Sequence, residues 1–187
     1  MEIFGAVTGL LYVWLEIKQK PVMWVIGFVS SLVYVVVNIQ YKVYGYAALN
    51  VYYAAVSIYG WYCWRYARQA GSAETGLQIS RIRIQSALAL VAISAVLYLG
   101  CGFALQRFTD SPIPFYDALG TSLSIVATWM LARKILEHWT LWIFINFFSA
   151  ALYFHRELYP TTVLFIVCGI MSVVGWLKWK QSIEKEK

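Results

Sequence analysis

The sequence predicts an all-α integral membrane protein with seven transmembrane helices. Apolar residues make up 61% of its 187 residues and charged residues only 13%, whereas soluble domains average about 45–50% and about 25%. Seven apolar segments alternate with polar segments, and the chain repeats itself at a fixed offset. Most of the surface is therefore expected to face lipid, and residues 1–187 are expected to form a single membrane domain.

Hydropathy locates the spans, because a transmembrane helix needs about 20 mostly apolar residues. The expected spans are Ile3–Leu15, Val22–Ile39, Tyr44–Trp64, Ile84–Leu105, Phe115–Leu131, Trp139–Phe154 and Leu158–Leu177. The first is short and is expected to include Glu16 and Ile17. The long polar stretch Arg65–Arg83 is expected to be a loop between two halves.

Basic residues are distributed unevenly between the two ends of the spans. Three of the fifteen (Lys42, Arg107 and Arg156) fall on the side of the N-terminus, and twelve fall on the other side. Because lysine and arginine concentrate in cytoplasmic loops, the N-terminus is predicted outside and the C-terminus in the cytoplasm of a bacterial inner membrane. Topology thus explains the net charge of +6, and no nucleic-acid partner is expected.

An internal repeat runs through the chain at a single ungapped offset of 115 residues. Eight of the nine tryptophans form matched pairs, namely Trp14 with Trp129, Trp24 with Trp139, Trp61 with Trp176 and Trp64 with Trp179. Repeat one is expected over 2–66, the linker loop and fourth helix over 67–111, and repeat two over 116–181.

Each repeat holds three spans, so two repeats joined directly would be inverted relative to each other. The fourth helix restores the orientation, and the predicted architecture is 3+1+3 with parallel repeats. Small transporters of the SWEET type share this arrangement and bind substrate near the midplane between the repeats. By this analogy we expect a carrier of a small solute.

The candidate site is expected where the two repeats differ. Gly27, Ser31 and Asn50 correspond to Trp142, Asn146 and Phe165. Stripes at helical spacing then extend this set along the second, third and sixth spans. The candidate solute-binding residues are Trp142, Asn146, Asn50, Tyr53, Trp61, Ser31, Tyr34, Asn38 and Trp139.

Structural alternatives apply to several of these residues. Asn50 and Asn146 are costly in lipid without partners, so each is expected either to face a cavity or to join two helices. Tryptophans near span ends are typical of the membrane interface. On this basis Trp24, Trp64, Trp139 and Trp179 are expected at the interface, where Trp64→Phe would have little effect.

Several function classes are excluded by what the sequence lacks. The nine acidic residues and both histidines are expected at span ends or in loops, so no buried carboxylate is expected. Cys63, Cys101 and Cys168 match no metal or disulfide spacing, and no metal or cofactor is expected. Once the spans are assigned, no set of potential catalytic residues is expected to lie close together, so the chain is not expected to be an enzyme. No cleavable signal peptide is apparent after Met1.

Several stretches resemble the PnuC-type bacterial vitamin transporters over nearly the whole chain. These stretches are Ile58–Trp64, Leu123–Ala127, Ala132–Lys134 and Glu137–Asn146, the last containing W-x-x-W-x-x-x-N. The resemblance implies a SWEET-like fold and uptake of nicotinamide riboside by facilitated diffusion, with trapping by a cytoplasmic kinase. It also implies that Trp142 and Asn146 line the site, with aromatic rings around the nicotinamide and amides on the ribose.

The solute has alternatives. Riboside carriers of the family have a glutamine where this chain has Asn50, and the shorter amide leaves thiamine as an alternative for the same site. Both solutes are flat heteroaromatic cations, which an aromatic cage can bind. A SWEET-like sugar carrier is a more remote alternative. The expected partners are the vitamin, the bilayer and functionally the kinase, and homo-oligomerisation is left open.

Overall fold

The computed structural model describes residues 2–41, 44–66, 77–109 and 113–185. These residues form seven α-helices that follow the expected spans in order. They are α1 (Glu2–Ile17), α2 (Val22–Gln40), α3 (Tyr44–Tyr66), α4 (Ile84–Phe108), α5 (Pro114–Ala132), α6 (His138–His155) and α7 (Tyr159–Lys185). The all-α class agrees with the prediction, and α7 continues well beyond its expected end at Leu177.

Three of these helices, α2, α4 and α7, are long and apolar enough to cross a membrane among the described residues. The helix α1 is shorter, with 16 residues. The helices α3, α5 and α6 carry more tyrosine, tryptophan, serine, threonine and asparagine. These residue types lower the hydropathy of the segments, and they supply the polar groups of the interior described below.

The helices α1 and α5 end in the same way, at positions 115 residues apart. Gln19 and Lys134 adopt left-handed backbone conformations, with φ angles of 53° and 49°. The amide of the following residue then bonds back to a carbonyl five residues earlier, Lys20 to Leu15 and Ile135 to Met130. This pattern satisfies carbonyls that a helix end leaves unpaired.

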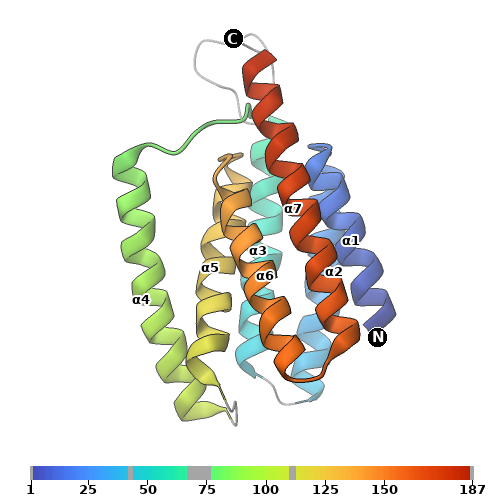
Figure 1. The fold of residues 1–187 in the computed structure, drawn as a ribbon, viewed down its shortest axis with the longest axis vertical. Helices are drawn as coiled ribbons and strands as arrows, with labels where there is room; N and C mark the ends of the chain where they lie inside the picture. Colours follow the sequence, from blue (N-terminus) through green and yellow to red (C-terminus); the bar gives the residue numbers. More distant parts are fainter. Residues whose placement is uncertain (1, 42–43, 67–76, 110–112, 186–187) are drawn as a thin grey trace.

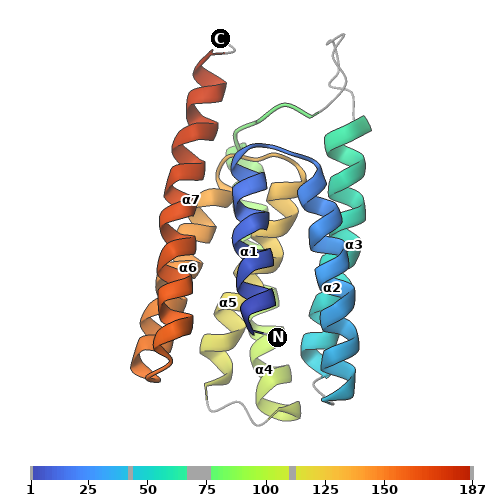
Figure 2. The same ribbon diagram turned by 90° about the vertical axis from the view of Figure 1, so that its right-hand side faces the viewer.

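The helices pack as neighbouring pairs, α2 with α3, α6 with α7 and α4 with α5. Helix α1 lies between α2 and α7, while α5 contacts α3 and α6 (Figure 2). Helix α4 stands at the edge of the bundle beside α5 (Figure 1). There Gly102 makes room for the ring of Phe115, which lies 2.6 Å from where a Cβ would be.

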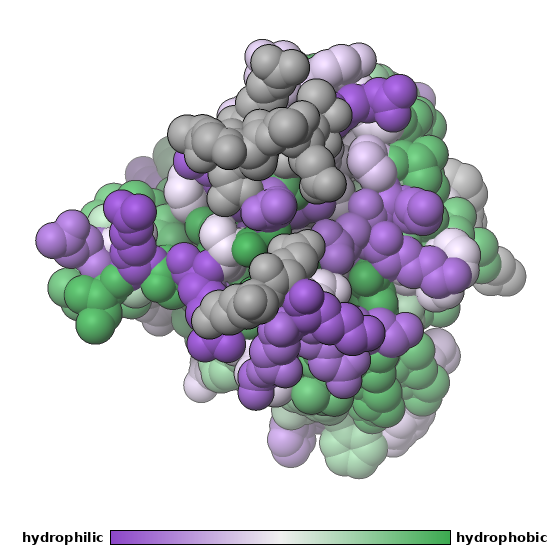
Figure 3. Space-filling model, turned by 90° about the horizontal axis from the view of Figure 1, so that it is seen from above, coloured by the Kyte–Doolittle hydropathy of each residue, from purple (hydrophilic) through white to green (hydrophobic). Residues whose placement is uncertain are grey.

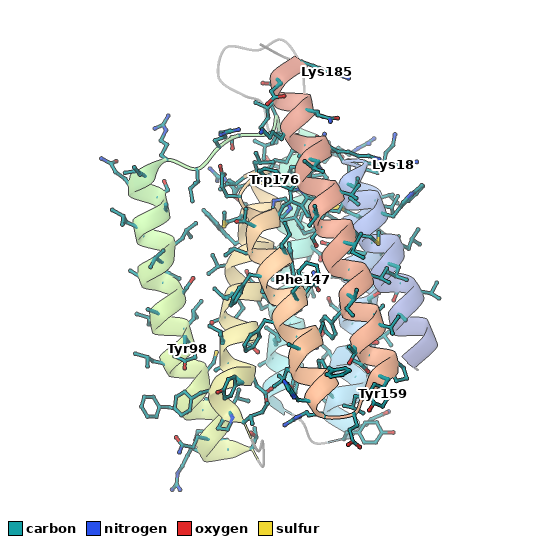
Figure 4. All side chains as sticks on the ribbon, in the orientation of Figure 1. Lys18, Tyr98, Phe147, Tyr159, Trp176 and Lys185 are labelled. Carbon is teal, nitrogen blue, oxygen red and sulfur yellow. The ribbon has the colours of Figure 1, made fainter. Side chains whose placement is uncertain are left out.

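Residues 77–83 cross one end of the bundle before α4 and are tied to the turn between α5 and α6 (Figure 1). Ser80 pairs with this turn through two backbone hydrogen bonds of 2.9 Å, to Lys134 and Leu136. The amide of Ile82 donates to the carboxylate of Glu137 at 2.9 Å. Hydrophilic side chains gather over this end (Figure 3), where Lys18 and Lys185 also lie, while Tyr159 lies at the opposite end (Figure 4).

Four tryptophans form a tryptophan layer beneath this end: Trp24 of α2, Trp64 of α3, Trp139 of α6 and Trp179 of α7. They are 0–4% exposed, so the interfacial placement expected from the sequence is wrong. Trp24 and Trp64 meet edge to face at 5.7 Å, Trp139 and Trp179 do the same at 5.7 Å, and Trp64 contacts Trp179 at 6.0 Å. Contacts with other aromatic rings across the bundle stabilise the inward orientation of these side chains, although they lie near the ends of their helices.

Two indole hydrogen bonds extend the layer to α1 and α5. Trp64 Nε1 donates to the carbonyl of Leu131, and Trp179 Nε1 donates to the carbonyl of Glu16, both at 3.3 Å. Donors and acceptors in the two bonds are each 115 residues apart. The layer therefore connects α3 to α5 and α7 to α1 in the same way.

Two glycines make the layer possible, and we expect their substitution to destabilise the protein. A Cβ at Gly60 would lie 2.4 Å from the ring of Trp24, and one at Gly175 would lie 2.5 Å from Trp139. Gly60→Ala and Gly175→Ala should therefore each lower the free energy of unfolding by about 1–3 kcal/mol through overpacking. Thermal unfolding in detergent would measure the change.

Gly100→Ala is the matched control, because nothing lies within 4 Å of its Cβ position. There alanine should maintain or raise stability, since it favours a helix over glycine. Equal melting temperatures for all three variants would contradict this account of the layer.

Candidate functional site

A cavity of about 340 Å³ lies inside the bundle between α1, α2, α3, α6 and α7, with Thr128 as its contact on α5. Seven of the nine sequence-predicted residues line it. They are Trp142, Asn146, Asn50, Tyr53, Ser31, Tyr34 and Trp139. The structure therefore brings residues from three helices together around one space, although whether they bind solute stays a prediction.

Helix α6 supplies the stripe of Trp139, Trp142 and Asn146. Asn146 is 7% exposed, and its side-chain amide donates to Ser172 Oγ of α7 at 3.2 Å. Ser172 in turn donates to the carbonyl of Cys168 at 2.8 Å. Asn146 thus lines the cavity and also joins two helices. The two roles that the sequence analysis treated as alternatives both apply to this residue.

Trp142 presents a donor without a partner. Among the described residues, its Nε1 is buried and has no hydrogen-bond acceptor, and the same is true of Trp139. A buried unpaired donor costs roughly 1–3 kcal/mol. Both tryptophans line the cavity, but the covered N–H groups themselves are not exposed to it.

The other wall comes from α2 and α3. Tyr53 and Asn50 lie one helical turn apart on α3, and Ser31 and Tyr34 lie on α2. The Asn50 amide donates to the carbonyl of Tyr46 in its own helix at 2.8 Å. One N–H of Asn50 is therefore used within its own helix and not toward the cavity.

Two predicted residues lie elsewhere. Trp61 lines a smaller hollow of about 200 Å³ together with Trp24, Phe28 and Ile58. Asn38 does not belong to the lining of either space. The helical spacing placed both on the correct helices, but the stripe extends past the ends of the cavity.

Helix α1 contributes residues that the sequence reasoning missed. Thr8, Tyr12 and Glu16 line the cavity, and their spacing of four residues places them on one face of the helix. The positions 115 residues later are Leu123, Ala127 and Leu131. Comparing α1 with α5 in the same way as the other spans would have revealed this polar stripe.

Tyr12 also packs into the space that Gly27 leaves free because it has no side chain. A Cβ at Gly27 would lie 3.0 Å from the Tyr12 ring, so the glycine leaves space for the tyrosine. The corresponding residues in the second half are Ala127 and Trp142. The large aromatic side chain thus comes from α1 in one half and from α6 in the other, and the cavity is asymmetric.

Glu16 and His138 form a buried polar pair at the end of the cavity next to the tryptophan layer. His138 Nε2 lies 2.9 Å from Glu16 Oε1, and the two residues are 0% and 2% exposed. The expectation that the interior holds no carboxylate is therefore wrong. Glu16 lies at the end of α1, as expected, but the turn that follows keeps this end inside the bundle against the first residue of α6.

The positions related to this pair by 115 residues are Leu131 and Met23, both buried and apolar. The polar pair therefore occurs on one side of the molecule, and an apolar pair takes its place on the other. This difference allows a matched test of its contribution to stability.

Apolar helices around a polar, aromatic cavity are the features of a multi-pass membrane transporter. The chain belongs to the family described as nicotinamide mononucleotide transporter, whose sequence model matches residues 1–181. This result confirms the resemblance to PnuC-type transporters.

Curated relatives cover nearly the whole chain. The nicotinamide riboside transporter PnuC of Escherichia coli is 25% identical over 206 residues, covering 97% of this chain and 85% of that protein. The protein of the same name from Neisseria mucosa is 27% identical, covering 97% and 72%. The riboflavin/roseoflavin transporter RibM of Streptomyces davaonensis is 23% identical, covering 95% and 83%.

A solved structure shares the fold. The crystal structure of the vitamin B3 transporter PnuC superimposes with a TM-score of 0.74 at 24% identity, covering 98% of this chain and 81% of the other. The helical arrangement is therefore shared over essentially the full chain.

We expect the Glu16–His138 pair to show strong coupling in stability. His138→Met alone leaves a buried carboxylate without its partner, which should lower the free energy of unfolding by about 3 kcal/mol or more. Adding Glu16→Leu reproduces the apolar pair of the other half and should recover most of this loss. A double-mutant cycle by chemical or thermal unfolding would measure the coupling, and additive losses would contradict the pairing.

Proposed function

We propose that the protein takes up nicotinamide riboside across a bacterial inner membrane by facilitated diffusion, and that a cytoplasmic kinase traps the solute. Two relatives that match almost the whole chain are named nicotinamide riboside transporters. The observation that carries the proposal is the cavity wall of α6, where Trp142 and Asn146 meet. It offers an aromatic face and an amide in one space.

The chemistry of the cavity fits a heteroaromatic nucleoside. Tyr12, Tyr34, Tyr53, Trp139 and Trp142 surround the space with aromatic rings, which can stack on a flat cationic ring. The amides and hydroxyls of the lining can bond the ribose. A sugar alone would use the polar groups and leave most of the aromatic surface without a matching face.

Thiamine remains the second candidate, because the α3 wall presents Asn50 rather than a longer amide. That side chain donates to its own helix at 2.8 Å, so it reaches less far into the cavity than a glutamine would. Thiamine is also a flat cation and needs no ribose contact at this position.

Transport is proposed to be uncoupled from ion gradients. Proton-driven carriers usually place an ionisable residue in the membrane interior, and Glu16 is a buried residue of this kind. However, the Glu16 carboxyl group already has a partner within the protein, because His138 Nε2 lies 2.9 Å from its Oε1. Solute entry therefore needs no accompanying ion, and net uptake would follow from phosphorylation in the cytoplasm.

We also infer a 3+1+3 arrangement with the C-terminus in the cytoplasm. Support comes from the contacts that recur at an offset of 115, such as those of Trp64 and Trp179 with α5 and α1. Lys18 and Lys185 lie at one end of the bundle (Figure 4), which is the end that the basic residues predict to be cytoplasmic. A C-terminal reporter active only in the periplasm would contradict this orientation.

Purified protein in liposomes should equilibrate radiolabelled nicotinamide riboside in both directions and stop at equal free concentrations. Thiamine, riboflavin and glucose, each tested alone, identify the solute if the riboside is wrong. Accumulation of the riboside above the external concentration under a proton or sodium gradient, with the membrane potential clamped at zero, would refute uncoupled transport.

Trp142→Ala should remove a stacking surface and weaken riboside binding by about tenfold or more. Asn146→Leu should have a similar effect by removing the orienting amide. Calorimetric titration in detergent would measure both. Trp14→Ala is the control, because Trp14 is 46% exposed and does not line the cavity. Folded variants that bind like the wild type would show that the α6 stripe serves packing.

A further inference from the structure

Glu16 has an unusual position in the cavity wall. Of the lining residues that the structure describes, it alone carries a formally charged side chain. Its partner His138 does not belong to the lining. The carboxyl group therefore stands between His138 on one side and the cavity on the other.

The hydrogen bonds of His138 fix where its protons are. Nδ1 lies 2.7 Å from the carbonyl oxygen of Ile135, which can only accept, so Nδ1 carries a hydrogen. Nε2 lies 2.9 Å from Glu16 Oε1. A neutral ring facing an ionised carboxylate would place two lone pairs against each other at this distance. The contact therefore holds one proton, either on the ring or on the carboxyl group.

The surroundings favour the ring as its holder. The imidazole is flanked by the indoles of Trp139 and Trp179, with ring centres 4.7 Å and 4.9 Å away, and aromatic rings stabilise a cation. With the proton on the ring, Glu16 is a carboxylate, and His138 lies on the side of it that faces away from the cavity.

We propose that Glu16 recognises the positive charge of the solute, so that the cavity selects a cationic heteroaromatic ring over a neutral ring of the same shape. The proposal deepens the proposed function and rests on it for the presence of solute in this cavity. A cation makes a second contact with the carboxylate, whereas a neutral ring only removes it from water.

The geometry also predicts the orientation of the bound solute within the cavity. Glu16 and Trp139 lie at the end near the tryptophan layer, and Asn146 lies seven residues further along α6, about 10 Å away at 1.5 Å per residue. The cationic ring would then lie at the Glu16 end, with the remaining hydroxyl groups toward Asn146 and Ser31. Among the described lining residues, the Asn146 end of the cavity carries no charged side chain that could make an equivalent contact in the reverse orientation.

Nicotinamide riboside and its neutral 1,4-dihydro form test the proposal, because they differ in charge and little in shape. Calorimetric titration at pH 7 should show the wild type preferring the cation by at least about tenfold. Glu16→Gln should reduce this preference to less than about threefold by weakening only the binding of the cation. Glu184→Gln, which removes an exposed acid at the end of α7, should leave the preference unchanged.

If Glu16→Gln does not fold, the paired change Glu16→Leu with His138→Met removes the charge and should also abolish the preference. A wild type that binds both forms equally, or a Glu16→Gln variant that keeps the preference, overturns the role of Glu16 and leaves riboside transport standing. If thiamine binds instead and loses affinity in Glu16→Gln, the riboside assignment falls and the role of Glu16 stands. Binding of neutral solutes alone overturns both.

Discussion

Four tryptophans from α2, α3, α6 and α7 meet at one end of the bundle, and the cavity and the polar pair both depend on this contact. Trp64 and Trp179 touch each other and each bonds a carbonyl on a helix of the other half. Because lipid provides no hydrogen-bond partners, groups at this depth must be satisfied by the protein itself. The bonds of Trp64 and Trp179 do this, whereas the indole N–H groups of Trp24 and Trp139 have no acceptor among the described residues. The layer also covers the end of the cavity where Glu16 lies.

Matched contacts surround a site that is itself unmatched. The layer, its glycines and the turns after α1 and α5 all recur at an offset of 115. Within the cavity some matched positions carry different residues: Tyr12 faces Gly27 in one half, while the other half has Ala127 and Trp142. A framework of equal contacts can thus hold two differently shaped walls, which a solute with two unlike ends requires.

The helices and most of the cavity wall were predictable from the sequence, because hydropathy and helical spacing are local properties. The α6 stripe of Trp142 and Asn146 follows from its spacing alone. Glu16 was misjudged because its partner His138 is 122 residues away, and no local pattern reveals whether a span end turns inward. The tryptophans were misjudged for the same reason, since their position along a helix fixes depth but not the direction that they face.

The packing of Tyr12 against Gly27 constrains the order in which such a site can change during evolution. With Tyr12 present, even a Cβ at position 27 would lie 3.0 Å from its ring, so a tryptophan there would overlap the tyrosine. To change from the arrangement of the first half to that of the second by single substitutions, Tyr12 must therefore be replaced by a small residue before Gly27 is replaced by a large one. With small residues at both positions, the cavity would be larger at this point than in either present arrangement.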